Sequence, residues 1–294
     1  MEWKNKRVLV TGSEGMIGKE LVLQLRELKC KVYTCDIVGK PNIPTDLRYF
    51  EECETIVNNV DFVFHLAGIK GSPKMTNEKP ADFMKMLQFD ANMIYASQGK
   101  IKRFLYTSSI AVEHPETDKY PAWAKMTGEK LIEAMRIQYP VKYGINSPDK
   151  KYGTQWCIVR PANVYGRFDN FDNPNAMVVT SFISKMMKNR KLILDKKGRE
   201  QVRDLINAKD VARGMIKCME EMPIKPVNLC SGKGIKIKDI AKTIADELKN
   251  VELEYQDLNL TLGPNKKVMK NPYVKPQISL KEGIKEVIKW RTIV

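Results

Sequence analysis

Residues 8–36 read VLVTGSEGMIGKELVLQLRELKCKVYTCD, and this stretch decides the fold class. It opens with an apolar run at 8–10 and passes directly into glycines spaced three residues apart, at positions 12, 15 and 18. Residues 19–29 carry apolar side chains at helical spacing, which predicts an amphipathic helix. Residues 31–36 follow as a second strand that ends in an acid. The stretch therefore predicts a strand, a glycine turn, a helix and a second strand.

Each glycine of this turn has a physical role in dinucleotide binding. Gly12 allows the tight turn off the strand, Gly15 lets backbone amides approach a pyrophosphate, and Gly18 lets the helix pack closely on the sheet. The unpaired N–H groups at the helix N-terminus favour phosphate oxygens. The carboxylate of Asp36 can accept both ribose hydroxyls of an adenosine, and it favours NAD because a 2′-phosphate would meet a like charge. The residues of the turn expected to contact the cofactor also include Glu14, Met16 and Ile17.

The bulk composition bounds the class of protein. With 294 residues, 43% of them hydrophobic, the chain can build one large domain or two unequal ones. We find no apolar span of 18 residues and no apolar signal region before the first strand, so we expect a cytoplasmic protein without a transmembrane helix. The net charge of +15 suits an anionic partner, but the lysines are scattered along the chain. A nucleotide-linked substrate is therefore favoured over nucleic acid.

The cysteines and histidines argue against a metal centre. None of the six cysteines forms a C-x-x-C pair, and several lie in apolar, strand-like runs, so we expect free buried thiols. They are Cys30, Cys35, Cys53, Cys157, Cys218 and Cys230. The only histidines are His65 and His114, which excludes a histidine-based metal cluster, and we expect no metal cofactor.

Predicted strands and helices alternate at least five times in the first 160 residues. This alternation predicts an α/β protein with a doubly wound parallel sheet of the Rossmann type. The pattern loosens after Gly166, where two helical stretches (237–249 and 279–290) surround a section rich in Pro, Gly and Lys. We expect a dinucleotide-binding domain at 1–166, to which 201–232 return. A smaller C-terminal α/β substrate lid would comprise 167–200 and 233–294.

Small and polar residues end the predicted strands that follow. Residues 61–68 form a buried strand ending in Leu66, Ala67 and Gly68, where a cofactor can pass close to the backbone. Residues 101–109 form another strand, which ends in the hydroxyls of Ser108 and Ser109. Asp46 and Leu47, in the loop after the second strand, are expected to line an adenine pocket.

Several motifs of the chain occur together in one known family. These are the glycine turn, residues 65–68 and 107–109, AKMTGE at 124–129, RPANVYG at 160–166 and RDLINAKDVA at 203–212. As a set they resemble the extended short-chain dehydrogenase/reductase family, which includes NAD-dependent nucleotide-sugar epimerases, dehydratases and reductases. The resemblance runs from residue 7 to about residue 215. It implies a nucleotide-sugar substrate and a homodimer joined through residues 81–98 and 122–138.

The resemblance also implies residue roles. Ser109 matches the catalytic hydroxyl that hydrogen-bonds a sugar hydroxyl or ketone. Lys125 matches the lysine that holds the nicotinamide ribose, and its charge favours the ionised form of a neighbouring tyrosine that acts as general acid/base. Further cofactor contacts are implied for Pro161, Asn163 and Val164. Substrate contacts are implied for Ser108, Asn163 and Arg203.

One position departs from the family pattern. The family tyrosine stands four residues before the lysine, and here Pro121 occupies that place. Tyr120 is one residue earlier, which in a regular helix turns it about 100° away. Because proline is accepted in the first turn of a helix, Tyr120 can lie just outside it and serve as the acid/base. Glu113, His114 or a bound water are the alternatives, and so is the absence of any proton-transfer group.

The residues after the hydroxyls narrow the reaction. Ile110 and Ala111 stand where sugar dehydratases of the family carry acids, which disfavours a 4,6-dehydratase. The cysteine that the epimerising reductases place near position 110 is also missing. We therefore expect epimerase-like or keto/hydroxyl redox chemistry by hydride transfer on a nucleotide-linked sugar. The alternative is a non-catalytic relative of the same fold that binds NAD or RNA.

Overall fold

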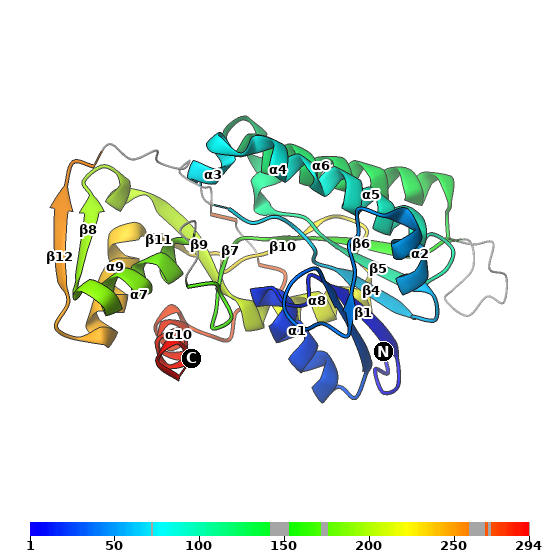
Figure 1. The fold of residues 1–294 in the computed structure, drawn as a ribbon, viewed down its shortest axis with the longest axis horizontal. Helices are drawn as coiled ribbons and strands as arrows, with labels where there is room; N and C mark the ends of the chain where they lie inside the picture. The colour runs from blue at the N-terminus through cyan, green and yellow to red at the C-terminus, as the bar shows by residue number, and fades with distance from the viewer. Residues whose placement is uncertain (72, 142–152, 172–175, 259–267, 270–271, 294) are drawn as a thin grey trace.

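A computed structural model describes residues 1–71, 73–141, 153–171, 176–258, 268–269 and 272–293. Its centre is a seven-stranded sheet in the order β10-β6-β5-β4-β1-β2-β3 (Figure 1). Every pair of neighbouring strands in it is parallel. The strands are β1 (Arg7–Thr11), β2 (Lys31–Asp36), β3 (Ile43–Pro44), β4 (Phe62–His65), β5 (Arg103–Thr107), β6 (Gln155–Pro161) and β10 (Val227–Leu229).

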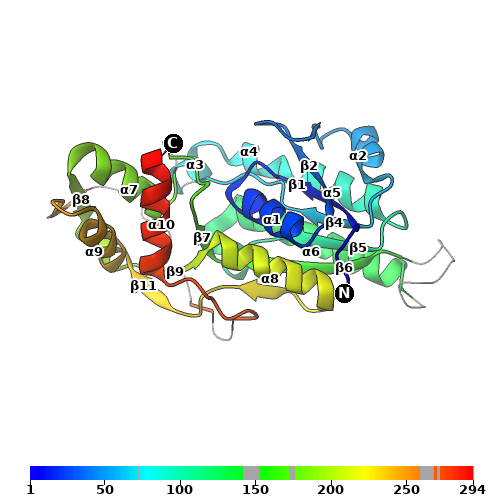
Figure 2. The same ribbon diagram turned by 90° about the horizontal axis from the view of Figure 1, so that it is seen from below.

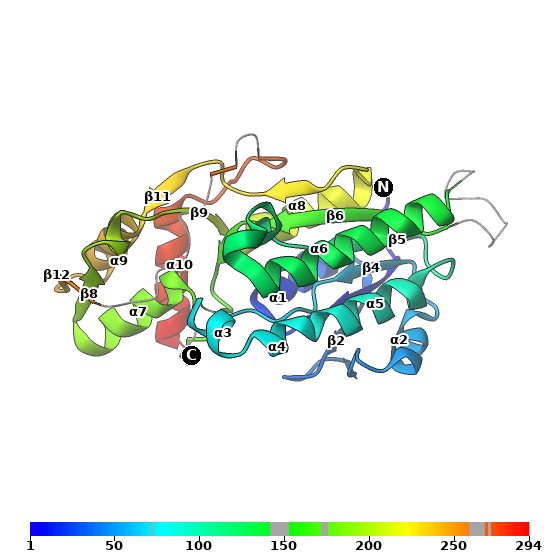
Figure 3. The ribbon, with the colours of Figure 1, turned by 90° about the horizontal axis from the view of Figure 1, so that it is seen from above.

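Helices cover both faces of this sheet. Helices α1 (Met16–Glu27) and α8 (Ala208–Glu221) pack side by side on one face (Figure 2). The other face carries α2 (Phe50–Val57), α5 (Met86–Ser97) and α6 (Pro115–Gln138) (Figure 3). Burial between two helical layers explains the apolar run at 8–10, whose three side chains are fully buried. The predicted α/β, doubly wound parallel sheet is confirmed.

The remaining elements gather beyond one end of the large sheet (Figure 1). The strands β7 (Asn163–Tyr165), β9 (Val202–Asn207) and β11 (Gly234–Lys236) form a three-stranded sheet, and β8 (Lys191–Asp195) pairs with β12 (Glu252–Gln256). Helices α7 (Val178–Asn189), α9 (Ile237–Leu248) and α10 (Leu280–Ile293) pack with them around a separate apolar core. Of the segment 201–232, α8 and β10 lie with the large sheet, whereas β9 pairs with β7 and β11.

The helix before Lys125 begins earlier than the sequence indicated. We expected a helix over 122–138, but α6 starts at Pro115, whose ring suits a first helical turn. The helix is interrupted at Lys119, which has φ 44° and ψ −117°. Pro121 follows this kink and opens the regular part of the helix. The expected helix over 81–98 is likewise divided, into α4 (Pro80–Met84) and α5, and α3 (Pro73–Glu78) precedes them.

The six cysteines are free thiols, and five of them are buried. Burial raises the pKa of both Cys35 and Cys218 to about 12, so these thiols stay protonated at neutral pH. No helix within the described ranges is both long and apolar enough to cross a membrane.

Candidate functional site

A cavity of about 860 Å³ lies where the strands β1, β4, β5 and β6 end, facing the C-terminal elements. Ligands of open parallel sheets bind outside the carboxyl ends of the strands, so this is the expected place. The cavity runs from the glycine turn to α7, β8 and β9. Both parts of the molecule therefore contribute to it.

Most of the site residues predicted from the sequence line this cavity. They are Gly12, Glu14, Gly15, Met16, Ile17, Gly18, Leu66, Gly68, Ser108, Ser109, Lys125, Pro161, Asn163, Val164 and Arg203. Five other predicted residues are absent from the described lining: Asp36, Asp46, Leu47, Ala67 and Tyr120.

The geometry of the glycine turn explains each of its glycines. Gly12 has φ +67°, and a Cβ there would stand 2.7 Å from the backbone N of Ala67. A Cβ on Gly18 would stand 2.2 Å from the carbonyl oxygen of Gly12. At Gly15 the only nearby atom is that same oxygen, at 3.2 Å, so its missing side chain leaves room on the cavity side. Within the described residues no side chain caps α1, which leaves its first N–H groups for an anion.

Asp36 ties the glycine turn to the end of β2. Its Oδ2 accepts a hydrogen bond of 3.0 Å from the backbone N of Glu14, and its Oδ1 accepts one of 2.8 Å from that of Ile37. A carboxylate has further lone pairs, so it can still accept from ribose hydroxyls. Across the cavity, the Thr107 hydroxyl is buried and finds no hydrogen-bond partner among the described residues. The open glycine turn and this unpaired hydroxyl both fit a bound dinucleotide.

Asp46 and Leu47 lie away from the cavity lining. Asp46 pairs with Arg48, whose Nε donates to Oδ1 at 2.9 Å. Leu47 is buried in the core beside Cys53 and Ile56. Their contact with an adenine ring therefore stays a prediction.

A buried polar cluster lies beneath the middle of the cavity. Thr11, His65 and Tyr106 form one row across neighbouring strands, because the sheet register pairs Thr11 with His65 and His65 with Tyr106. Asp90 of α5 accepts from the Tyr106 hydroxyl at 2.5 Å and lies 3.0 Å from His65 Nε2. Lys125 Nζ lies 3.2 Å from Asp90 Oδ2 and 4.8 Å from the centre of the Tyr106 ring. Lys125 is thus held from below while it lines the cavity.

The ionisation states within this cluster follow from burial and from these contacts. Burial opposes the charge of Asp90, but Lys125 and the hydrogen bonds from His65 and Tyr106 outweigh it and lower its pKa. Burial lowers the pKa of His65 and raises that of Tyr106 well above its usual value. At neutral pH the cluster therefore holds an ionised Asp90 beside a neutral His65 and a neutral Tyr106. His65 then donates from Nε2 to Asp90 and accepts at Nδ1 from the Thr11 hydroxyl, 2.7 Å away.

The two serines at the end of β5 have different surroundings. Ser108 donates to Glu129, which also binds the guanidinium of Arg160 with Nε to Oε1 at 2.8 Å. Glu113 pairs with the same guanidinium. Ser109 Oγ accepts from the backbone N of Ala111 at 3.1 Å and caps the short helix η1 (Ile110–Glu113). Its O–H hydrogen can still donate to a substrate oxygen.

The start of α6 places Tyr120 and Pro121 differently. Pro121 lines the cavity, together with Thr117 and Asp118 of the preceding turn. Tyr120 packs against the apolar cluster of Phe83, Met86 and Ala124. Its ring makes an edge contact with Trp123, with the ring centroids 5.2 Å apart. The role of Tyr120 as acid/base stays a prediction.

Basic and polar groups also line the cavity, from β9, α7 and the loop after β4. Arg203 of β9 is held by its neighbours in the chain: Nη1 donates to the Val202 carbonyl oxygen at 2.8 Å and Nη2 to Gln201 Oε1 at 2.9 Å. Burial lowers its pKa, and the nearby Asp118 partly offsets this. Lys70, from the loop after β4, pairs with Asp169, which also accepts from Thr180. Lys185 and Arg199 add further positive charge.

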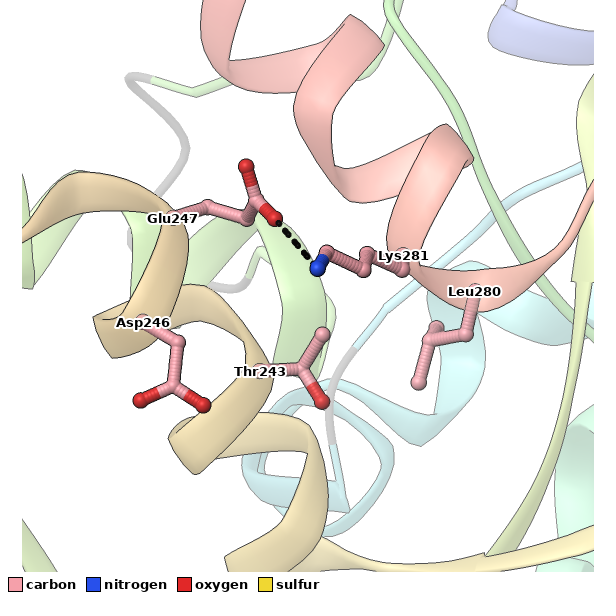
Figure 4. Close-up of a pocket in the computed structure, with 5 residues that line it drawn as sticks. All are labelled: Thr243, Asp246, Glu247, Leu280 and Lys281. Carbon is pink, nitrogen blue, oxygen red and sulfur yellow. Dashed lines mark ion pairs between the residues drawn. The ribbon is translucent and has the colours of Figure 1, made fainter.

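A second, smaller cavity of about 270 Å³ lies between α9 and α10 (Figure 4). Lys281 and Glu247 pair across it, with Nζ 3.6 Å from Oε1. Among the described residues no group of His, Cys, Asp and Glu side chains is placed to hold a metal ion.

Sequence reasoning missed several residues of the main cavity and its base. Asp90 lies on helix α5 among other polar residues, and no sequence motif distinguishes it from them. Thr11 and His65 meet because β1 and β4 are neighbours in the sheet, and this strand order is not visible in the sequence. Lys70 and Asp169 come from loops, where only the folded chain shows which residues meet.

Comparisons with known proteins identify the family and the fold of the chain. The sequence model of the NAD dependent epimerase/dehydratase family matches residues 8–230. UDP-glucuronic acid decarboxylase 6 of Arabidopsis thaliana is 26% identical over 316 residues, covering 97% of this chain and 84% of that protein. UDP-N-acetylglucosamine 4-epimerase of Methanobrevibacter ruminantium, solved with UDP-N-acetylmuramic acid, superposes with a TM-score of 0.80 at 23% identity over 99% of both chains. UDP-glucose 4-epimerase of Thermus thermophilus, solved with NAD, gives 0.80 at 21% identity over 98% of this chain and 100% of that one.

The chain belongs to the NAD-dependent epimerase/dehydratase family. Its fold is that of the solved epimerases, as the superpositions show. The cofactor of this family is NAD, and its chemistry is hydride transfer on nucleotide-linked sugars. The family and the cofactor expected from the glycine turn and Asp36 are confirmed.

Proposed function

We propose that this protein is an epimerase-like or keto/hydroxyl oxidoreductase acting on a nucleotide-linked sugar. The observation that carries the proposal is one cavity lined by the glycine turn, Ser109, Lys125 and Arg203. A nucleotide diphosphate is an anion, and Lys185, Arg199 and Arg203 offer cations for it. The cavity thus offers the glycine turn to one phosphate-bearing molecule and these cations to another.

NAD, when bound, supplies the acceptor for the hydride that leaves a sugar C–H bond. Side chains of the protein bind the reacting sugar oxygen and accept its proton. Ser109 donates a hydrogen bond to the reacting sugar oxygen, and Lys125 binds the cofactor ribose. We propose Tyr120 as the base that takes the hydroxyl proton, since it is the phenol nearest to Lys125 in the sequence. An epimerase would then return the hydride to the opposite face of the sugar.

The proposed cofactor contacts are those of the glycine turn, Asp36 and the strand ends. The proposed substrate contacts are Ser108, Asn163 and Arg203. We also propose two domains: a dinucleotide-binding domain of residues 1–166 and 201–232, and a smaller substrate lid of 167–200 and 233–294, from which Lys185 and Arg199 line the cavity. The separate apolar core around α7, α9 and α10 supports this division, while β9 joins the two parts.

We also propose a homodimer in which α5 and α6 of two copies pack together. These helices lie side by side, and each exposes a large aromatic side chain: 57% of Tyr95 and 44% of Trp123 are accessible. Sedimentation analysis of the wild type and of Trp123→Ser tests this. A dimer that Trp123→Ser weakens is expected, and a monomeric wild type would contradict it.

The test of function is turnover of UDP-, GDP- and dTDP-linked sugars in the presence of NAD, followed by NMR of the sugar carbons. We expect inversion or oxidation at one carbon, and a loss of about a hundredfold in Ser109→Ala with unchanged NAD affinity. Ser108→Ala is not a matched control, because Ser108 binds Glu129. Ser231→Ala, which changes a serine at Asp204 outside the described cavity lining, serves instead.

A second candidate is a non-catalytic protein that binds NAD. The packing of Tyr120 in an apolar cluster, with Pro121 at the cavity, favours it. The same experiment separates the two. NAD binding without turnover of any of these sugars would contradict the enzyme and support the binding protein.

A further inference from the structure

The charge pair beneath the cavity joins α5 to α6 and is deeply buried. Only 2% of the Asp90 side chain and 10% of the Lys125 side chain are accessible. A buried charge without a partner is strongly unfavourable, so each of these groups stabilises the charge of the other. The pair is therefore close to neutral as a unit, although Lys125 by itself would bring a positive charge to the cavity.

The surroundings of Asp90 keep its carboxylate charged and fixed. Tyr106 and His65 each donate to one of its oxygens, and Gly128 makes room for the Tyr106 hydroxyl. A Cβ at Gly128 would stand 2.2 Å from that hydroxyl oxygen. Neither His65 nor Tyr106 adds charge at neutral pH, since burial lowers the pKa of the first and raises that of the second.

The oxidation state of a nicotinamide changes its charge. The ring is a cation in NAD⁺ and neutral in NADH, so a nearby positive charge weakens the binding of NAD⁺ alone. A unit charge about 10 Å away, at an effective dielectric constant of 20, changes a binding constant by about tenfold. A carboxylate that neutralises the charge of Lys125 would remove this preference for NADH over NAD⁺.

We infer that Asp90 is a positioning residue that sets the oxidation-state preference of the bound cofactor, by offsetting the charge of Lys125 and fixing its ammonium group. The inference rests on the proposed contact of Lys125 with the nicotinamide ribose. Asp90 itself lies below the cavity lining and acts through Lys125. It thereby favours the NAD⁺ form, which accepts a hydride from a sugar.

The experiment measures the dissociation constants of NAD⁺ and NADH for purified wild type and variants, by calorimetric titration. In Asp90→Asn the side chain keeps its size but loses its charge. We expect the ratio of NADH affinity to NAD⁺ affinity to rise about tenfold. Lys125 would then stand as an uncompensated cation. If both forms weaken by the same factor, Asp90 has only a structural role and the inference is overturned.

Asp61→Asn is the matched control. Asp61 is also a poorly exposed carboxylate, and it accepts from the backbone N of Arg7 at 2.9 Å, but it lies at the opposite end of the sheet strands. The same chemical change there should leave the ratio within about twofold of wild type. Tyr106→Phe removes a hydrogen bond to Asp90 and leaves both charges, so its ratio should also stay within about twofold. A tenfold shift in either variant would contradict a charge effect.

Lys125→Met provides a test that does not depend on the folding of Asp90→Asn. Lys125→Met removes the positive charge, so the ratio of NADH affinity to NAD⁺ affinity should fall. The ratio stays unchanged if Asp90 takes up a proton in this variant. A shift toward NADH would overturn the inference. A wild type that binds neither dinucleotide would instead contradict the proposed function, so the two failures are distinguishable.

Discussion

The glycine turn and the start of α6 lie on the same cavity and are built in opposite ways. In the turn, Gly12 and Gly18 are fixed by backbone contacts. Asp36 accepts hydrogen bonds from three backbone amides, those of residues 14, 37 and 38. At the start of α6, Lys119 has φ 44°, and Glu116, Thr117 and Lys119 are exposed. The cofactor side of the cavity is thus fixed by close packing, whereas the proposed acid/base, Tyr120, lies beside a kink in α6.

The largest effect should come from breaking the packing of the glycine turn. In Gly18→Val the added Cβ would meet the Gly12 carbonyl oxygen at 2.2 Å, and backbone cannot easily move there. We expect NAD affinity to fall at least about a hundredfold, with a lower melting temperature. Titration with NAD and thermal unfolding followed by circular dichroism measure the two effects.

Gly15→Ala is the partner of this variant and separates binding from folding. Its Cβ would meet only one protein atom, at 3.2 Å, and the Gly15 backbone (φ −70°) suits alanine. We expect a nearly unchanged melting temperature and a loss of about tenfold in NAD affinity. Wild-type affinity in Gly15→Ala would show that the cofactor does not approach the backbone at this residue.

The second effect concerns the start of α6. If Tyr120 moves the proton, Tyr120→Phe should lower the turnover of the nucleotide sugar by about a hundredfold or more, because general acid–base catalysis contributes on that scale. NAD affinity should change less than about twofold, since the ring and its apolar contacts remain. The measurement is steady-state turnover together with NAD titration.

Tyr139→Phe, which removes a hydroxyl at the far end of α6, is the control for this variant and should keep wild-type turnover. Full activity in Tyr120→Phe would remove Tyr120 from the mechanism. The proton would then pass through another group, such as Glu113 or His114, or through water.

The same contrast explains what the sequence could predict. The alternation of strands and helices, the glycine turn and the acid at the end of the second strand follow from local patterns of apolar residues and glycine spacing. Many of the fifteen predicted residues that line the cavity follow strands of the large parallel sheet, whose carboxyl ends meet at one edge. Local patterns were sufficient to predict a site residue wherever that residue belongs to the turn or strand end that the pattern indicates.

Features made by tertiary packing could not be predicted in this way. Asp90 joins the site only because α5 and α6 pack together over the sheet. The kink at Lys119 and the apolar packing of Tyr120 depend on α4 and α5, whose division was not visible in the periodicity. The pairing of Lys70 with Asp169 joins two loops 99 residues apart in the sequence. Such contacts need the folded chain.

The smallest expected effect is a pH dependence of the free energy of unfolding that comes from His65, beneath the cavity. His65 is fully buried under the cofactor half, and burial lowers its pKa below the usual 6.5. Above pH 6.5 His65 is neutral in both states and its contribution to stability is complete. As the pH falls below 6.5 the unfolded chain binds a proton before the folded one, so the free energy of unfolding decreases until the folded pKa is reached.

Urea unfolding at about pH 7.5 and about pH 5.5 measures this decrease. We expect the loss of stability between the two values to be about 1 kcal/mol smaller in His65→Gln than in wild type. An equal loss in wild type and His65→Gln would show that the buried cluster does not resist protonation. The packing beneath the cavity would then be less rigid than its contacts indicate, and it would differ less from the start of α6.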